Sequence, residues 1–260
     1  MNDFLEKGWV KFPAEPDVSN WVRSVFPVAK ERVEAPEEQK WLRCEGTWFV
    51  GVDALPNDAQ GNVAGSGSLS GAAHATARGI YGDLPLHRGQ VSVVYPGYPR
   101  PVEGEGKVAF GYRLRRDAAH VDGLLPEGPD KRRYLKERHA YILGLPLTSC
   151  SAGASPLSVW EGSHIIMRRA FEAALQDVPQ EAWDRVDLTD IYKAARREVF
   201  ATCTRILVPA EPGEAYLVHR LALHGVAPWE TAAEAPKEGR MIVYFRPEWP
   251  EPTDRWLTDP

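Results

Sequence analysis

The stretch 212–225, PGEAYLVHRLALHG, and the tripeptide 120–122, HVD, decide the architecture and the site that this sequence predicts. The longer stretch contains an alternating apolar segment that ends in a histidine followed by glycine, a pattern typical of a β-strand. In a strand, residues two apart project from the same face, so His120 and Asp122 can bind one ion together. We therefore predict strands that carry metal ligands.

The stretch 212–225 offers two histidines as a third ligand, His219 and His224. They are five positions apart, an odd number, so in a regular strand they point to opposite faces. Only one can then join His120 and Asp122. We choose His224, because Gly225 directly after it lets the chain turn away at the mouth of a barrel. His219 is expected to pack or hydrogen-bond away from the metal.

Strand-forming segments separated by Gly and Pro turns dominate the chain from residue 90 onward. Many short strands with such turns are typical of an antiparallel sandwich or barrel. An earlier strand is predicted at 44–52, and the later ones are predicted at 91–95, 108–114, 140–147, 156–160, 206–209, 215–223 and 241–245.

Helices are predicted at two places outside this pattern. Near the start, Ser19 can cap a helix that Pro27 limits, and a charged segment follows at 30–41. In the block 165–202 the apolar spacing turns helical, with Asp187 or Thr189 able to cap a helix. This block is predicted to be a helical insert in the sheet.

We expect one domain over residues 1–260, with its core at approximately 90–246 and N-terminal helical and strand support at 1–89. The sequence has no internal repeat and no linker long enough to divide it. The glycine-rich stretch 61–71 lacks the Gly-Lys-Ser/Thr ending of a phosphate-binding P-loop. A flexible surface loop is the favoured interpretation of that stretch.

Composition limits the partners and the compartment. The 260 residues are 43% hydrophobic and carry a formal net charge of -5, as expected of an ordinary globular protein without a nucleic-acid partner. The basic runs 113–116 and 131–133 are short and are expected to be solvated or to face substrate. Three scattered cysteines and the lack of a signal peptide or membrane-length apolar run favour a cytoplasmic protein.

Two imidazoles and one carboxylate form the ligand set of mononuclear non-haem Fe(II) oxygenases, and they leave other coordination positions open. The sequence also resembles the phytanoyl-CoA dioxygenase-like family of Fe(II)- and 2-oxoglutarate-dependent oxygenases over roughly residues 90–246. The resemblance rests on four pieces in order, which are HVD at 120–122, GASPLSVWEGSH at 153–164, PGEAYLVHRLALHG at 212–225 and GR at 239–240. Glu161 and Glu214 depart from the family's usual proline and aspartate.

The resemblance implies a mainly β fold with a double-stranded β-helix core, also called a jelly roll or cupin-like fold. It implies that His120, Asp122 and His224 hold Fe(II), with 2-oxoglutarate and O₂ as co-substrates that yield succinate and CO₂. The resemblance also implies an arginine that holds the distal carboxylate of the oxoacid. We favour Arg240 for this role, with Arg246 as the alternative. His164 is expected to have a structural role. The carboxylate of Asp122 favours hydroxylation over halogenation.

Three functions follow from these patterns. The first is hydroxylation of a small organic molecule by a 2-oxoglutarate-dependent Fe(II) dioxygenase. The second is a cupin-like metalloenzyme, such as an isomerase or hydrolase, that uses no oxoacid. The third is a jelly roll that only binds a metal or ligand. We expect no nucleic-acid or membrane partner, and a homodimer is a further expectation.

Overall fold

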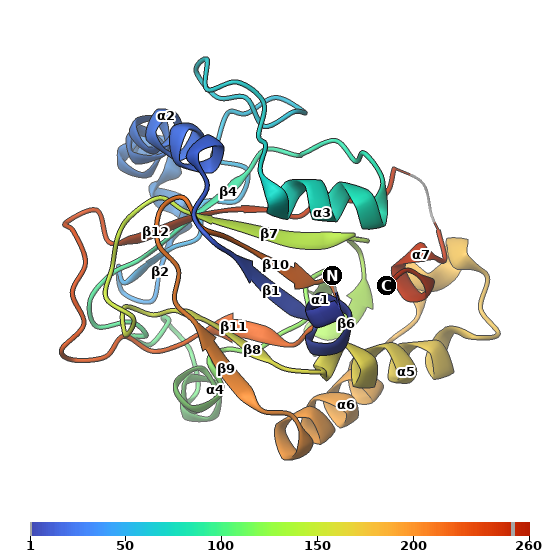
Figure 1. Ribbon diagram of the computed structural model, residues 1–260. Helices are drawn as coiled ribbons and strands as arrows, with labels where there is room; N and C mark the ends of the chain where they lie inside the picture. The colour runs from blue at the N-terminus through green and yellow to red at the C-terminus, as the bar shows by residue number, and fades with distance from the viewer. Residues whose placement is uncertain (1, 251–252) are drawn as a thin grey trace.

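The computed structural model describes residues 2–250 and 253–260 and contains two large antiparallel sheets surrounded by helices (Figure 1). The first sheet consists of β1 (Trp9–Phe12), β2 (Leu42–Arg43), β3 (Trp48–Phe49), β4 (Gln90–Val94), β7 (Tyr141–Pro146), β10 (Ala215–His219) and β12 (Arg240–Phe245). The second consists of β8 (Leu157–Trp160), β9 (Arg205–Val208) and β11 (His224–Val226). The strand orders are β1-β10-β7-β12-β4-β3-β2 and β11-β8-β9, and β5 (Leu124–Glu127) pairs with β6 (Arg132–Leu135) as a separate hairpin.

Helices cover the outside of the sheets (Figure 1). They are α1 (Asn2–Lys7), α2 (Pro16–Glu34), α3 (Ala72–Tyr81), α4 (Lys107–Arg116), α5 (Ser163–Leu175), α6 (Thr189–Thr202) and α7 (Arg255–Thr258), with 3₁₀ turns η1 (Pro36–Trp41) and η2 (Gln180–Arg185). Within the described residues, none of these helices has the length and apolar content needed to cross a bilayer. The helical insert predicted between strands is present as α5, η2 and α6.

The central strands β4, β7, β10 and β12 of the seven-stranded sheet are buried on both faces, which explains their nearly continuous apolar sequences. In β12, Met241, Val243 and Phe245 pack in the main core with residues of α2 and α3. Ile242, which projects from the opposite face, packs with residues of both sheets. The period of two therefore sends one face toward the helices and the other toward the second sheet, where a ligand cavity can form.

One predicted strand is wrong, because residues 108–114 lie in helix α4. The apolar side chains Val108, Phe110, Tyr112 and Leu114 alternate as in a strand, but they do not line a buried face. Val108 is 86% exposed, and Gly111 is the one buried residue of the helix. Alternating apolar residues do not by themselves predict a strand when the segment has no buried face to pack.

Pro27 does not end the first long helix, as the sequence predicted, but lies inside α2. Proline in a helix interior costs about 3 kcal/mol or more. The buried face of α2 nevertheless continues past it, from Val22 and Val25 to Ala29 and Val33. Packing of this face against the core therefore outweighs the local cost.

The segment 215–223 is not one continuous strand. Strand β10 ends at His219, the backbone N–H of Ala222 donates to the His219 carbonyl oxygen at 2.8 Å, and β11 begins at His224 in the other sheet. His219 and His224 were expected on opposite faces of one regular strand, and this expectation was wrong. They are separated by a change of sheet.

Substitution of Gly144 tests the packing between the central strands β7 and β10. A Cβ atom added to Gly144 in β7 would lie 2.1 Å from the Tyr216 ring, which projects from the neighbouring β10. We expect Gly144→Ala to lower the free energy of unfolding by about 1–3 kcal/mol in urea denaturation, because the ring must move in a packed core. Gly79→Ala in α3 is the control, since nothing lies within 4 Å of its added Cβ. Equal losses in both variants would contradict the close contact.

Candidate metal centre

A pair of reciprocal hydrogen bonds brings two of the predicted ligands together. The backbone N–H of His120 donates to the His224 carbonyl oxygen at 2.8 Å, and the N–H of His224 donates to the His120 carbonyl oxygen at 3.1 Å. This is an isolated antiparallel bridge, and His120 lies outside any longer strand. The expected placement of His120 and Asp122 on a regular strand is therefore wrong, although their side chains do converge.

Gly225 has a different role from the chain turn that the sequence suggested. It lies inside β11, and an added Cβ would be 2.2 Å from the carbonyl oxygen of Asp117. The segment before His120 can therefore run directly against β11 only because residue 225 has no side chain. The next residue, Val226, adds an N–H bond to the same Asp117 carbonyl at 3.1 Å.

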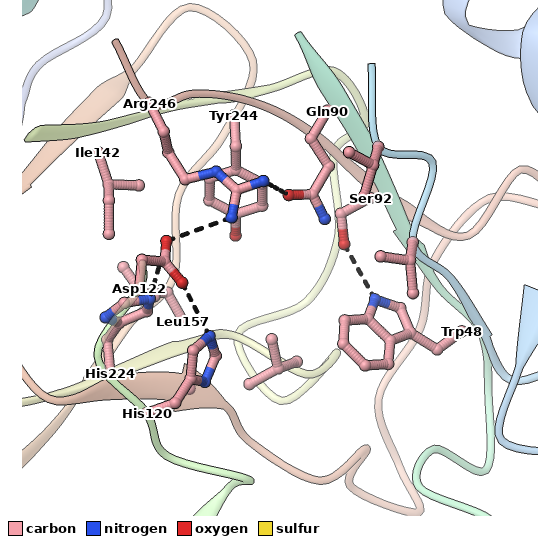
Figure 2. Close-up of a pocket in the computed structure, with 14 residues that line it drawn as sticks. Trp48, Gln90, Ser92, His120, Asp122, Ile142, Leu157, His224, Tyr244 and Arg246 are labelled. Carbon is pink, nitrogen blue, oxygen red and sulfur yellow. Dashed lines mark hydrogen bonds and ion pairs between the residues drawn. The ribbon is translucent and has the colours of Figure 1, made fainter. Parts of the chain in front are cut away.

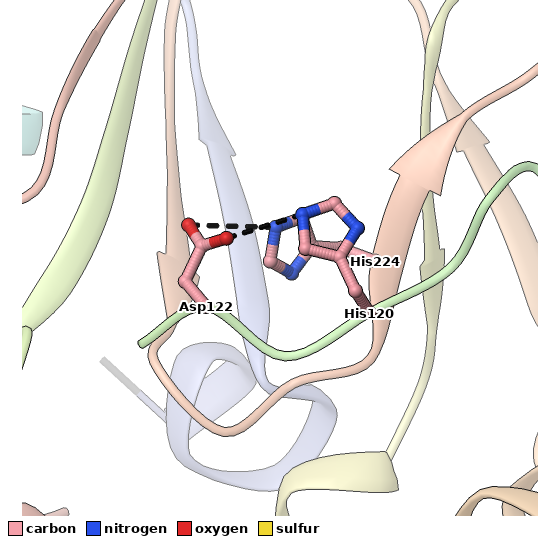
Figure 3. A group of neighbouring side chains, drawn as sticks. All are labelled: His120, Asp122 and His224. Carbon is pink, nitrogen blue, oxygen red and sulfur yellow. Dashed lines mark ion pairs between the residues drawn. The ribbon is translucent and has the colours of Figure 1, made fainter. Parts of the chain in front are cut away.

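The side chains of His120, Asp122 and His224 form a compact group (Figure 3). Their potential ligand atoms all lie within 4.8 Å of one another. The Nε2 atom of His120 is 3.1 Å from Asp122 Oδ1, and the Nε2 atom of His224 is 3.8 Å from Asp122 Oδ2. Two imidazole nitrogens and one carboxylate thus face one point, as three ligands on one side of a metal require.

Backbone carbonyls orient both imidazole rings. His120 Nδ1 lies 3.0 Å from the Ala118 oxygen, and His224 Nδ1 lies 2.9 Å from the Ala222 oxygen. A carbonyl can only accept, so each Nδ1 carries a proton and each Nε2 is the atom left to face a metal, which for His120 requires loss of the proton that its Nε2 donates to Asp122. Metal-binding histidines are held in the correct tautomer by contacts of this kind. The donor set therefore fits a divalent transition metal.

Burial and neighbouring charges shift the pKa values of all three potential ligands. Burial acts to raise the pKa of Asp122, but the charge of Arg246 and the hydrogen bond from His120 hold that pKa well below its usual value. Burial lowers the pKa of His224 to about 4, with Asp122 opposing the shift. For His120, desolvation is outweighed by the hydrogen bond and charge of Asp122, so its pKa is raised. His120 is thus the ligand at which protons compete most with a metal.

The group lies in the wall of a cavity of about 200 Å³ between the two sheets (Figure 2). Apolar side chains form most of its surface, including Trp48, Ile142 and Leu157. Its polar residues, apart from the three potential ligands, are Gln90, Ser92, Tyr244 and Arg246. A mostly apolar cavity with a few converging polar groups is the usual form of a small-molecule site.

Arg246, the alternative anchor, lies beside this group. Its Nη1 is 3.3 Å from Asp122 Oδ2, and its Nη2 donates to the side-chain oxygen of Gln90 (Figure 2). The backbone N–H of Arg246 also donates to His87 Nε2 at 2.7 Å. These contacts fix the arginine where its guanidinium meets both Asp122 and the cavity.

Arg240, the favoured anchor, lies at the other end of β12 and does not line this cavity within the described residues. It is 6% exposed, and its Nη1 has no hydrogen-bond partner. The phenols of Tyr216 and Tyr244, which are 2.8 Å apart, lie close enough to influence its charge. Tyr244 lines the metal cavity, so this tyrosine stands between the cavity and Arg240.

The remaining candidate histidines lie away from the group. His219 is fully buried and lies beside His164, with ring centroids 4.8 Å apart. His219 Nδ1 accepts from the Leu221 N–H at 2.9 Å, and His164 Nε2 contacts the Leu5 carbonyl oxygen at 2.9 Å. Both contacts bind neighbouring chain segments together. Burial lowers the pKa of each of these two histidines, so both are neutral near physiological pH.

Two polar residues of β4, Gln90 and Ser92, line the cavity and were not predicted as site residues from the sequence. They were detectable in principle, since they are polar side chains two residues apart in the otherwise apolar strand QVSVV. Spacing of two places both on one face. Tyr244 and Arg246 show the same spacing at the end of β12.

A second and wider cavity, of about 860 Å³, meets the same group from the other side. His120, Asp122 and Arg246 line both cavities. Helix α4 contributes Tyr112 to the wall of the wide cavity, and α6 contributes Arg196. Its volume lies in the usual range of small-molecule sites.

Comparison with known proteins gives only distant similarities. No protein-family model matches the chain, and no curated protein sequence matches it. The solved structures that it resembles include the non-heme alpha ketoglutarate dependent carbocyclase SnoK from nogalamycin biosynthesis, with 16% identity, a TM-score of 0.46 and coverage of 94% of this chain and 82% of the other. AviO1 from Streptomyces viridochromogenes Tue57 has 13% identity and a TM-score of 0.48, covering 97% and 95%. EctD from S. alaskensis, solved with 2-oxoglutarate and 5-hydroxyectoine, has 13% identity and a TM-score of 0.45, covering 98% and 81%.

Metal affinity is expected to fall as the pH falls, because a proton and the metal compete for His120, whose pKa is raised. One displaced proton gives a decrease of up to about tenfold per pH unit below that pKa. Titration with Co(II) as a spectroscopic substitute, at several pH values from mildly alkaline to mildly acidic, measures this slope. His224 adds a second proton only near its pKa of about 4. A pH-independent affinity would contradict ligation by His120.

Proposed function

We propose that this chain is an Fe(II)- and 2-oxoglutarate-dependent dioxygenase with a jelly-roll core, which hydroxylates a small organic molecule. The observation that carries the proposal is the convergence of His120, Asp122 and His224 on one point in a cavity wall. Fe(II) held by these residues would supply the oxidative chemistry, in which one atom of O₂ enters the substrate as hydroxyl and the other enters succinate as the oxoacid loses CO₂. The chain supplies three ligands and leaves the remaining positions to those small molecules.

We assign to Arg246 the role of positioning the carboxylate of Asp122, the proposed metal ligand. Its guanidinium is held between Asp122 and Gln90, so it fixes the direction of the carboxylate that faces the two imidazoles. A charged partner at 3.3 Å also keeps Asp122 ionised, which metal binding requires. Because it is so near Asp122, Arg246 would meet an oxoacid at its metal-bound end.

Arg240 is assigned to the distal carboxylate of the oxoacid. A buried guanidinium without a bound anion is costly, and the unpartnered Nη1 of Arg240 leaves one of its donors free. A carboxylate at this place would neutralise the charge and accept two parallel hydrogen bonds. The phenols of Tyr216 and Tyr244 lie beside it as further hydrogen-bonding groups, and Tyr244 must leave room for the ligand to reach Arg240.

A cupin-like metalloenzyme that uses no oxoacid is the second candidate. Two observations favour it: Arg246 is already paired with Asp122, and Arg240 lies outside the cavity that the metal ligands line. In that case the apolar cavity would hold part of the substrate itself. The two candidates differ in whether the metal-loaded protein binds 2-oxoglutarate.

Anaerobic addition of Fe(II) and then 2-oxoglutarate to the metal-free protein tests the proposal. We expect a weak visible charge-transfer band, because the oxoacid binds the iron directly through its keto and carboxylate oxygens. His120→Ala is expected to abolish the band, whereas His219→Ala leaves it, since His219 contacts other parts of the fold. If iron is bound and the band is absent, the protein is not an enzyme of this class.

Substitution of the two arginines separates their roles. Arg240→Ala is expected to weaken 2-oxoglutarate binding by about tenfold to a hundredfold through loss of a charge-assisted pair, with iron affinity unchanged. Arg240→Lys keeps the charge but loses the planar two-point contact, so it should restore only part of the affinity. Arg246→Ala is expected to weaken iron binding as well, because Asp122 loses its partner. The reverse pattern would make Arg246 the distal anchor.

A further inference from the structure

A strongly basic groove lies between α4 and α6, next to the wide cavity. Its volume is about 350 Å³, and it is lined by Tyr112, Arg116, Lys193, Arg196, Arg197 and Phe200. Figure 1 places the two helices at the same edge of the molecule, beside the three-stranded sheet. Four of the six lining residues are cations and none is an acid, in a chain whose net charge is -5.

The four cations are not neutralised by neighbouring acids. No ion pair within 4.0 Å joins any of them to an Asp or Glu among residues 2–250 and 253–260. The acids of this region are paired with other arginines: Glu105 with Arg113, Asp117 with Arg205, Asp187 and Asp190 with Arg132, and Glu198 with Arg169. Positive charge therefore remains in the groove, where a concave surface concentrates its field.

Aromatic rings hold two of the guanidinium groups in place. Arg196 lies over the rings of Tyr112 and Tyr192, at 4.8 and 5.1 Å from their centroids. Arg116 lies over the ring of Phe200 at 4.5 Å. Stacking on a ring leaves the N–H groups at the edge of each guanidinium free to donate, and it reduces the freedom that would be lost on binding an anion.

The groove adjoins the wide cavity. Tyr112 and Arg196 line both the groove and the wide cavity, which extends to His120 and Asp122. A molecule that passed these two side chains and occupied both cavities would have one end at the metal centre and the other among the cations. A phosphate group suits the second end, because its several charged oxygens can accept bonds from more than one arginine.

We propose that the groove binds the phosphate or diphosphate end of an elongated substrate whose reacting carbon lies in the wide cavity beside the metal. This assignment of substrate class rests on the proposed oxygenase function for the role of the metal end. The anion site itself depends only on Arg116, Lys193, Arg196 and Arg197. It can therefore be tested on protein that holds no metal.

Calorimetric titration of the metal-free protein with pyrophosphate at low ionic strength tests the groove. Wild type is expected to bind at a single site, and the double variant Lys193→Ala/Arg197→Ala to bind about tenfold or more weakly, because two charge-assisted contacts are lost. Both residues are exposed, so the fold should tolerate the change. The control variant is Arg23→Ala/Arg43→Ala. It alters one exposed arginine of α2 and one of β2, and it makes the same change in net charge. This control should retain wild-type affinity.

Absence of pyrophosphate binding, or an equal loss in the control variant, would overturn the proposal. Phenyl phosphate distinguishes an esterified substrate from free phosphate: tighter binding of the ester than of inorganic phosphate supports the proposal, and the opposite order overturns it. Tighter binding of a single-stranded oligonucleotide than of pyrophosphate would identify a nucleic-acid surface instead. Since no iron or oxoacid is present, these results are independent of the charge-transfer experiment.

Discussion

The site depends on the backbone bridge between His120 and His224. Two hydrogen bonds, of 2.8 and 3.1 Å, hold together segments that are separated by about a hundred residues of chain, including the whole helical insert. The bridge forms only because Gly225 lets the Asp117 carbonyl approach β11 without a Cβ between them. Once the backbones are paired, the carbonyls of Ala118 and Ala222 set the direction of both rings, so the geometry of the ligands follows from main-chain contacts.

Asp122 is the electrostatic centre of this arrangement. It lies between two imidazoles and a guanidinium, and the charge of Arg246 together with the hydrogen bond from His120 outweighs the cost of burying its carboxylate. The same residue lies where the two cavities meet, one mostly apolar and between the sheets, the other wide and bordered by helices. A metal held there would be accessible from both cavities.

Charge is distributed unevenly over the molecule, and this is not evident from the net value of -5. Arg116 belongs to the basic run 113–116, which was expected from the sequence to be solvated or to face substrate. In the structure the run is divided: Arg113 pairs with Glu105, whereas Arg116 stacks on Phe200 and joins cations of α6. A local concentration of charge beside an entrance influences which ligands approach it, irrespective of the overall sign.

The sequence by itself determined the residue types of the candidate site and the series of strands after residue 90, because ligand chemistry and two-residue periodicity are local properties. It also predicted the helical insert. It did not determine where strands end: the strand predicted at 215–223 ends at His219 and the next one begins at His224 in the other sheet, and 108–114 form a helix, because burial and pairing partners decide both. Tertiary structure alone decided that Arg246 contacts Asp122 while Arg240 is buried behind Tyr244, since Arg240 begins β12, Arg246 follows its last residue, and the sequence does not show what lies opposite either side chain.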